Sequence, residues 1–181
     1  MAWERGRGNV LTEPMTEPFP EGAQPPLADP AARAAAPGAG GRPAGGIASL
    51  VPELAVTDLP ASLLFWCGLL GFAVAYDRPA ARFAFLARGP VQVMLCERNG
   101  RWEPAPMERP FGRGINLQIT VPALAPILDA LAVAGWPLHE APREAWYRIG
   151  DRIGGQREFL VQDPDGYLLR FAESLGERPA G

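Results

Sequence analysis

Apolar and polar residues alternate along several short stretches of this chain, and this alternation predicts β-strands. In each stretch every second side chain is apolar, which is typical of a strand with one face on a core. The stretches cover residues 50–56, 72–76, 82–87, 91–96 and 115–121. Residues 136–138 resume extended structure, and a loop through Trp146 and Tyr147 should then lead to the last strands.

The clearest pattern lies in residues 155–171, which we interpret as a strand, a tight turn and a returning strand. The turn is Asp163-Pro164-Asp165-Gly166, whose residue order favours a type I turn. On the returning strand, apolar residues at 167, 169 and 171 alternate with 168, 170 and 172. One face can therefore pack on a core, and the other carries a lone arginine, Arg170.

Two helices are predicted between the strands. Thr57-Asp58 supplies an N-cap and Pro60 suits the first turn, so a helix should run to a C-cap at Gly71. A second helix, with leucines and an isoleucine at helical spacing in residues 124–131, should end at Gly135.

The two halves share one order of elements, and Leu70-Gly71-Phe72 corresponds to Ala134-Gly135-Trp136. Such a duplication predicts an α+β fold of two β-α-β-β-β modules. We expect the domain to span residues 47–176, with a flexible C-terminus at 177–181. Residues 1–46 are rich in Pro, Gly and Ala, and we expect them to form a disordered tail. Residues 97–113 form a long polar connection.

Composition narrows the partners and the compartment. The formal net charge of -3 gives no reason to expect nucleic acid binding. We see no apolar run long enough to cross a membrane and no signal peptide, so we expect a cytoplasmic protein. Cys67 and Cys96 could form one disulfide, although two reduced thiols suit that compartment better.

Several of these motifs resemble the bleomycin resistance proteins, which belong to the vicinal oxygen chelate superfamily together with glyoxalase I and the extradiol dioxygenases. The similar segments are 51–59, 65–66, 70–72, 108–114 and 157–166. The resemblance implies two modules that form a curled mixed sheet around a cleft, and a homodimer whose grooves are completed by both chains.

The metal-dependent relatives place one His, Glu or Gln on each of four strands. The corresponding residues here are Val51, Met94, Asn116 and Arg170, and three of these four are unsuitable as ligands of such a metal. The only histidine, His139, lies outside this set. We therefore expect no metal and no cofactor.

We also find no nucleophile with an activating base, so we name no catalytic residue. The interpretation that follows is a metal-free protein that binds a small molecule, such as a bleomycin-type antibiotic, and confers resistance by sequestration. A metal-dependent lyase or dioxygenase is one alternative, and a ligand-free scaffold or regulatory module is the other.

Strand alternation and the resemblance together supply candidate ligand-binding residues on the cleft face and in the loops. They are Glu53, Phe83, Trp102, Asn116, Gln118, Trp146, Tyr147 and Arg170. Within this set we expect Arg170 to pair with Glu53, because an unpaired charge in a partly buried cleft is costly.

Overall fold

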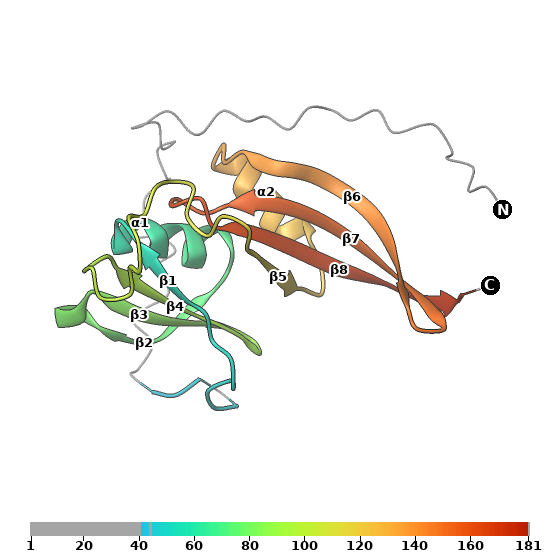
Figure 1. The fold of residues 1–181 in the computed structure, drawn as a ribbon. Helices are drawn as coiled ribbons and strands as arrows, with labels where there is room; N and C mark the ends of the chain where they lie inside the picture. The colour runs from blue at the N-terminus through green and yellow to red at the C-terminus, as the bar shows by residue number, and fades with distance from the viewer. Residues whose placement is uncertain (1–40, 44, 181) are drawn as a thin grey trace.

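The computed structural model describes residues 41–43 and 45–180. Most of the range expected to form a disordered tail therefore lies outside the described residues. Two modules follow one another along the chain (Figure 1). The N-terminal module contains β1 (Glu53–Val56), α1 (Leu59–Leu63), η2 (Leu64–Leu69), β2 (Ala73–Arg78), η3 (Pro79–Ala81), β3 (Phe83–Arg88) and β4 (Val91–Glu97). The C-terminal module contains β5 (Asn116–Thr120), α2 (Ala125–Val133), β6 (Leu138–Ile149), β7 (Arg152–Gln162) and β8 (Leu168–Pro179).

Each module forms its own four-stranded sheet, and both sheets have the same topology. Sheet A has the order β1-β4-β3-β2 and sheet B the order β5-β8-β7-β6. In each sheet the first strand of the module runs parallel to the last, and the remaining pairs are antiparallel. The predicted α+β fold of two β-α-β-β-β modules is confirmed, with the two sheets remaining separate and unclosed.

The helices begin and end at the predicted residues. The side chain of Asp58 accepts a hydrogen bond of 2.9 Å from the backbone N–H of Ala61, and Pro60 lies in the first turn. The helix continues through η2 as a π-helix, in which Leu70 donates to the carbonyl of Phe65. Gly71 then has a φ of 73°, a conformation that glycine adopts without strain.

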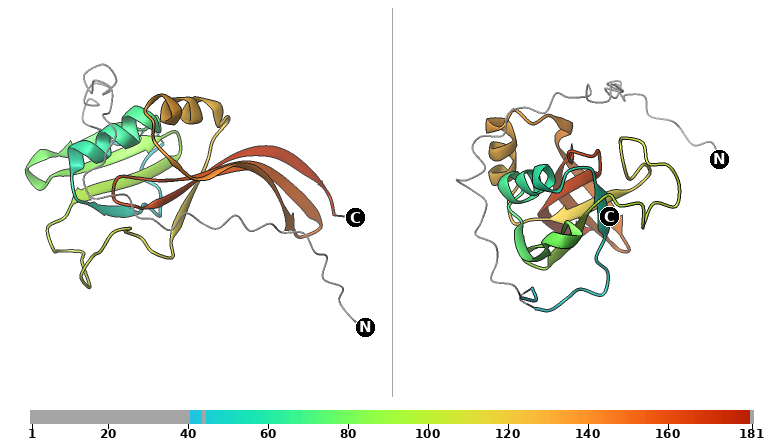
Figure 2. Two further views of the ribbon diagram at one scale, coloured as in Figure 1. Left: turned by 90° about the horizontal axis from the view of Figure 1, so that it is seen from above. Right: turned by 90° about the vertical axis from the view of Figure 1, so that its left-hand side faces the viewer.

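One apolar core serves both modules. It contains the inward faces of β1, β3, β4, β5, β7 and β8 and the buried sides of both helical segments. Phe65 of η2 packs against Trp136, which follows α2, with 4.7 Å between the ring centroids. Figure 2 shows the two helical segments next to each other on one side of the sheets. The faces of the two sheets that are turned away from the helices are therefore not part of this core.

The last three strands are longer than the sequence pattern indicated. Trp146 and Tyr147 lie within β6, so the loop expected there is wrong, and β8 continues to Pro179. Because β5 pairs with β8 only from Leu168 to Ala172, the three strands extend beyond β5 as an arm (Figure 1). We call residues 143–149, 152–158 and 173–179 the three-stranded arm.

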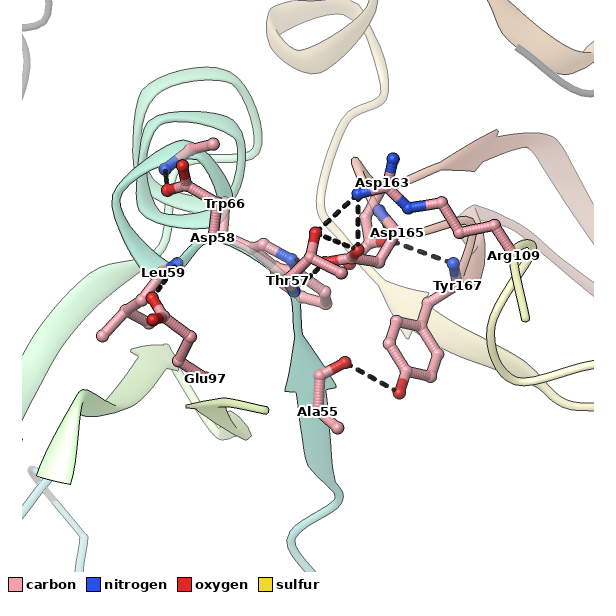
Figure 3. A network of polar contacts seen from close by, with 11 residues as sticks. Ala55, Thr57, Asp58, Leu59, Trp66, Glu97, Arg109, Asp163, Asp165 and Tyr167 are labelled. Carbon is pink, nitrogen blue, oxygen red and sulfur yellow. Dashed lines mark hydrogen bonds and ion pairs between the residues drawn. The ribbon is translucent and has the colours of Figure 1, made fainter. Parts of the chain in front are cut away.

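A polar network joins the two modules at the turn between β7 and β8 (Figure 3). Asp163 and Asp165 on this turn are both buried. Asp163 accepts a 3.3 Å hydrogen bond from Nε1 of Trp66 in η2, and Asp165 accepts two from Thr57 after β1. The hydroxyl of Tyr167 donates to the carbonyl of Ala55 on β1. The turn thereby fixes β8, and every side chain on it, relative to the N-terminal module.

Candidate functional site

Strand alternation sorts the side chains of sheet B as the sequence predicted. Leu169 and Phe171 of β8 are fully buried in the core, and Arg170 between them points to the face away from the helices. We call this second surface of sheet B the polar face. Its residues, taken from the strand registers, are Asn116, Gln118, Thr120, Arg143, Tyr147, Gln156, Glu158, Leu160, Leu168, Arg170 and Ala172.

A fully buried carboxylate, that of Glu158 on β7, lies at the centre of the polar face. Its Oε1 accepts a 3.0 Å hydrogen bond from the hydroxyl of Tyr147 and lies 2.6 Å from Nη2 of Arg143. Its Oε2 accepts a hydrogen bond from the amide of Gln156. A buried charge needs such partners, because burial without them would cost several kcal/mol.

Arg170 is the second charged residue of this cluster, and its partner differs from the one expected. Its Nη1 lies 3.7 Å from Oε2 of Glu158, and its side chain is 29% exposed. The expected pair with Glu53 is wrong, because Glu53 is an exposed residue of β1 in sheet A. The Nε atom of Arg170 is buried and has no hydrogen-bond partner in the part of the chain that the structure describes.

Four of the sequence-predicted site residues come together on the polar face: Asn116, Gln118, Tyr147 and Arg170. Gln118 lies beside Arg170 in the parallel pairing of β5 with β8, and both Asn116 and Gln118 are exposed. Tyr147 belongs to this group because its hydroxyl donates a hydrogen bond to Glu158.

Trp146 lies on the other face of sheet B from its neighbour Tyr147, because successive side chains of a strand point to opposite sides. Its indole covers Gly155 of β7, at which a Cβ atom would come within 2.5 Å of the ring. The guanidinium of Arg178 lies over the indole at 4.3 Å from the ring centroid. Trp146 and Tyr147 therefore cannot contact one ligand on the same face of this chain.

The remaining three candidates belong to the other part of the molecule. Glu53 and Phe83 are on sheet A, and Trp102 is in the connection between the modules. Phe83 is buried, with Tyr76 beside it and the guanidinium of Arg78 over its ring at 3.8 Å. Trp102 is 59% exposed, and Arg101 stacks on it.

The chain before β1 contacts the face of sheet A that is turned away from the helices. The side-chain amide of Gln92 on β4 donates to the carbonyl of Gly46 at 2.7 Å and accepts from the N–H of Ala48 at 2.8 Å. Gly41 donates to the carbonyl of Ala75 on β2, and Pro43 is buried. The first residues in contact with the domain thus precede residue 47.

Four acidic residues in or near the connection between the modules and in β6 are paired with arginines. The ion pairs are Glu97 with Arg82, Glu103 with Arg98, Glu108 with Arg113 and Glu140 with Arg143. The hydrogen bond from Arg82 lowers the pKa of Glu97, and that from Arg98 lowers the pKa of Glu103. The charges of Glu97 and Glu103 are therefore offset by arginines within the protein itself.

The residues at the family's metal positions do not fit a metal ion. Valine at 51 has no lone pair to donate, and the guanidinium of Arg170 is a cation with donors only. Within residues 41–43 and 45–180, no group of three or more His, Cys, Asp or Glu side chains is placed to hold a metal. We therefore derive no step through a metal.

The two thiols are free and are not activated as nucleophiles. Burial raises the pKa of Cys67 to about 11, and burial together with Glu53 raises the pKa of Cys96. A nucleophilic cysteine needs the opposite shift, toward the thiolate. Both residues are thus protonated at neutral pH.

Three polar residues of the site were missed by sequence reasoning: Arg143, Gln156 and Glu158. Glu158 stands between Arg157 and Phe159, and its parity with Leu160 places it opposite the core. That parity is readable in the sequence, where Phe159 and Val161 alternate with Glu158 and Leu160. Arg143 and Gln156 belong to a strand pairing that no periodic pattern signals.

No helix of the described residues is long and apolar enough to cross a membrane. A comparison with family models matches residues 46–171 to the glyoxalase/bleomycin resistance protein/dioxygenase superfamily. The comparison with curated proteins found no match.

Solved structures give further matches over the same part of the chain. A member of this superfamily from Vibrio splendidus 12B01 is 34% identical, with 69% of this chain and 97% of that chain covered and a TM-score of 0.32. TioX from Micromonospora sp. ML1 is 23% identical, covers 71% of this chain and 100% of its own, and has a TM-score of 0.53. An integron cassette protein of V. cholerae is 22% identical, with coverages of 70% and 95% and a TM-score of 0.52.

The last two matches show the fold, and the family model shows the family, because it matches more than half of the chain. Together with the two β-α-β-β-β modules, they establish that the chain belongs to the glyoxalase/bleomycin resistance protein/dioxygenase superfamily.

Proposed function

We propose that this protein binds a small organic molecule on the polar face of sheet B, without a metal and without changing it chemically, and acts by sequestration. The observation that carries this proposal is the buried carboxylate of Glu158 beside Arg170. Buried polar clusters that open to solvent are typical of binding sites, because they give a ligand fixed directions for hydrogen bonds. The residues at the metal positions and the protonated thiols give no support to a chemical step.

Bleomycin-type antibiotics are the first ligand class to test, since several sequence motifs resemble those of the bleomycin resistance proteins. A cationic ligand of this kind would need free acidic groups and aromatic plates. Trp102 offers an exposed indole, whereas the acidic residues that pair with arginines would have to exchange partners. Small-molecule binding is therefore the general proposal, and antibiotic resistance is its more specific form.

The functional unit in this proposal is a homodimer. Within one chain the polar face of sheet B and the outward face of sheet A remain parts of two separate sheets. The three-stranded arm exposes Trp146, Ile149 and Leu175, which are 42%, 57% and 38% exposed. Trp146 and Ile149 lie on opposite faces of the arm, so a second copy that packs around the arm would cover both and place its own sheet against the polar face.

Isothermal titration calorimetry with bleomycin, together with elemental analysis of the same sample, tests this function. We expect about one ligand per chain, recovery of unchanged ligand by mass spectrometry, and no stoichiometric metal. Gln118→Leu on the polar face should weaken binding, whereas Val133→Ser on the exposed side of α2 should not. Conversion of the ligand, or one tightly bound metal per chain, would show that the protein is an enzyme instead.

A further inference from the structure

We propose that the polar face receives the carboxylate of a small organic acid, and that the guanidinium of Arg170 is its receptor. This inference rests on the proposed small-molecule binding at the same face, and it names the chemical class of the ligand.

Arg170 has donors without acceptors. A guanidinium presents five N–H groups in one plane. The 3.7 Å separation from Glu158 is an ion pair, but it is too long for a hydrogen bond. The Nε atom is buried, and no acceptor lies within hydrogen-bond distance among the described residues. Because Nε itself is shielded from solvent, an external acceptor would meet the two Nη groups, which make no hydrogen bond among the described residues and belong to a side chain that is 29% exposed.

Glu158 does not accept a hydrogen bond from Arg170, because both of its carboxylate oxygens are engaged by other residues. Tyr147 and Arg143 contact Oε1, and Gln156 donates to Oε2. Three side chains therefore hold the Glu158 carboxylate in place, and its Oε2 attracts the guanidinium of Arg170. We interpret Glu158 as a positioning residue that orients Arg170.

The geometry favours a carboxylate over other anions. Two oxygens in one plane match the guanidinium fork, which forms two parallel N–H···O bonds with them. A phosphate dianion would instead bring two negative charges to Arg170, which already lies next to the buried carboxylate of Glu158. A monoanion with planar geometry suits the site better.

Neighbouring residues indicate the rest of the ligand. Gln118 lies beside Arg170 on β5 and has an exposed amide that can donate to the same carboxylate. Leu160 lies across from Arg170 on β7, and Leu168 is two residues before it on the same face; both are half-buried. An apolar, flat body attached to the carboxylate would cover these leucines.

Three naphthalene compounds with one ring system test this proposal by isothermal titration calorimetry on the full chain: 2-naphthoate, 2-naphthamide and 2-naphthylmethylamine. We expect 2-naphthoate to bind roughly tenfold or more tightly than the amide, since a charge-assisted pair contributes about 1.5 kcal/mol or more. Arg170→Gln should remove this preference, and Arg170→Lys should retain only part of it, because lysine keeps the charge without the fork.

Arg82→Gln is the matched control, since Arg82 is also an arginine paired with a carboxylate, that of Glu97, but lies in the N-terminal module and not on the polar face. It should change the affinity for 2-naphthoate by no more than about threefold, or well under 1 kcal/mol. Circular dichroism melting checks that each variant folds. Glu158 keeps its contacts with Tyr147, Gln156 and Arg143 in Arg170→Gln, and if that variant nevertheless unfolds, Arg170→Lys still tests the fork.

Equal affinity for acid and amide would overturn the proposal, as would an equal loss in Arg82→Gln, which would indicate unspecific charge attraction. Absence of measurable naphthoate binding to the wild type would also overturn it. Preference for the amine would overturn the carboxylate assignment and leave small-molecule binding intact. The proposed function fails separately, if bleomycin and all three naphthalene compounds do not bind.

Discussion

The hydroxyl of Thr57, just after β1, donates a 2.6 Å hydrogen bond to Oδ1 of Asp165 on the turn between β7 and β8. The backbone N–H of Thr57 donates to Oδ2 of the same carboxylate, and Arg109 of the connecting segment lies 3.0 Å from Oδ1. One buried carboxylate thus joins both modules and the connection between them. Because β8 continues from this turn, the contact also positions Arg170.

Replacing Thr57 should reveal how much this contact stabilises the protein. Thr57→Val keeps the shape and removes the hydroxyl, so we expect the free energy of unfolding to fall by about 1.5 kcal/mol, as for other hydrogen bonds to charged groups. Thr57→Ser keeps the hydroxyl and should lose less. Urea denaturation measures both variants. A Val variant as stable as the wild type, with the loss confined to Ser, would attribute the contribution of Thr57 to its methyl group instead.

Asp163 makes the stability of the protein depend on pH. Burial raises its pKa to about 7, above the model-peptide value of 3.8, and outweighs the hydrogen bonds from Tyr167 and Trp66. Between these two values the folded state holds a proton that the unfolded state has released. The free energy of unfolding should therefore fall as pH rises from about 4 to about 7, by up to roughly 4 kcal/mol.

Asp163→Asn provides the control, since an amide does not titrate. Denaturation at pH values from 4 to 8 should show a flatter dependence for this variant than for the wild type, even if the loss of the bond from Trp66 lowers its stability throughout. Parallel curves for the two proteins would assign the pH dependence to other groups.

The sequence predicts the faces of the strands better than it predicts contacts across them. Alternation depends only on the local geometry of a strand, so Leu169 and Phe171 could be assigned to the core and Arg170 to the other side. The partner of Arg170 depends on which strands pair. Strand alternation puts both Glu53 and Glu158 on the faces turned away from the core, so either could be the partner of Arg170. Only the pairing of β7 with β8 selects Glu158.

Strand β6 shows why part of the site could not be predicted. Its burial is irregular, and Pro142 and several charged residues interrupt any apolar period. The strand forms because its backbone pairs with β7 along most of its length. The loop predicted around Trp146 and Tyr147 is wrong for this reason.

Gly155 should not tolerate a side chain. A Cβ at this position would come within 2.5 Å of the ring of Trp146, on which Arg178 is stacked from the arm. We expect Gly155→Ala to displace the indole, lower the free energy of unfolding by about 1 kcal/mol, as overpacking does, and change the tryptophan fluorescence.

Gly68 offers a matched control, because it lies in η2 and a Cβ there meets nothing within 4 Å. Gly68→Ala should leave stability unchanged or raise it by up to about 1 kcal/mol, since alanine favours helices over glycine. If both alanine variants behave alike, the contact between Gly155 and Trp146 carries no energetic weight.

The segment before β1 should contribute to stability through Gln92. We expect a chain that begins at Gly41 to melt at the same temperature as the full chain, and a chain that begins at Leu50 to melt several degrees lower. The second truncation removes both hydrogen bonds of the Gln92 amide, at about 1 kcal/mol each, and the buried Pro43. Differential scanning calorimetry of the full chain and the two truncated chains measures these effects.

Gln92→Leu in the full chain should reproduce part of this loss. The same substitution should add little to the truncation at Leu50, because the partners of the Gln92 amide are already absent. Identical melting temperatures for all of these proteins would show that the segment rests on sheet A without stabilising it.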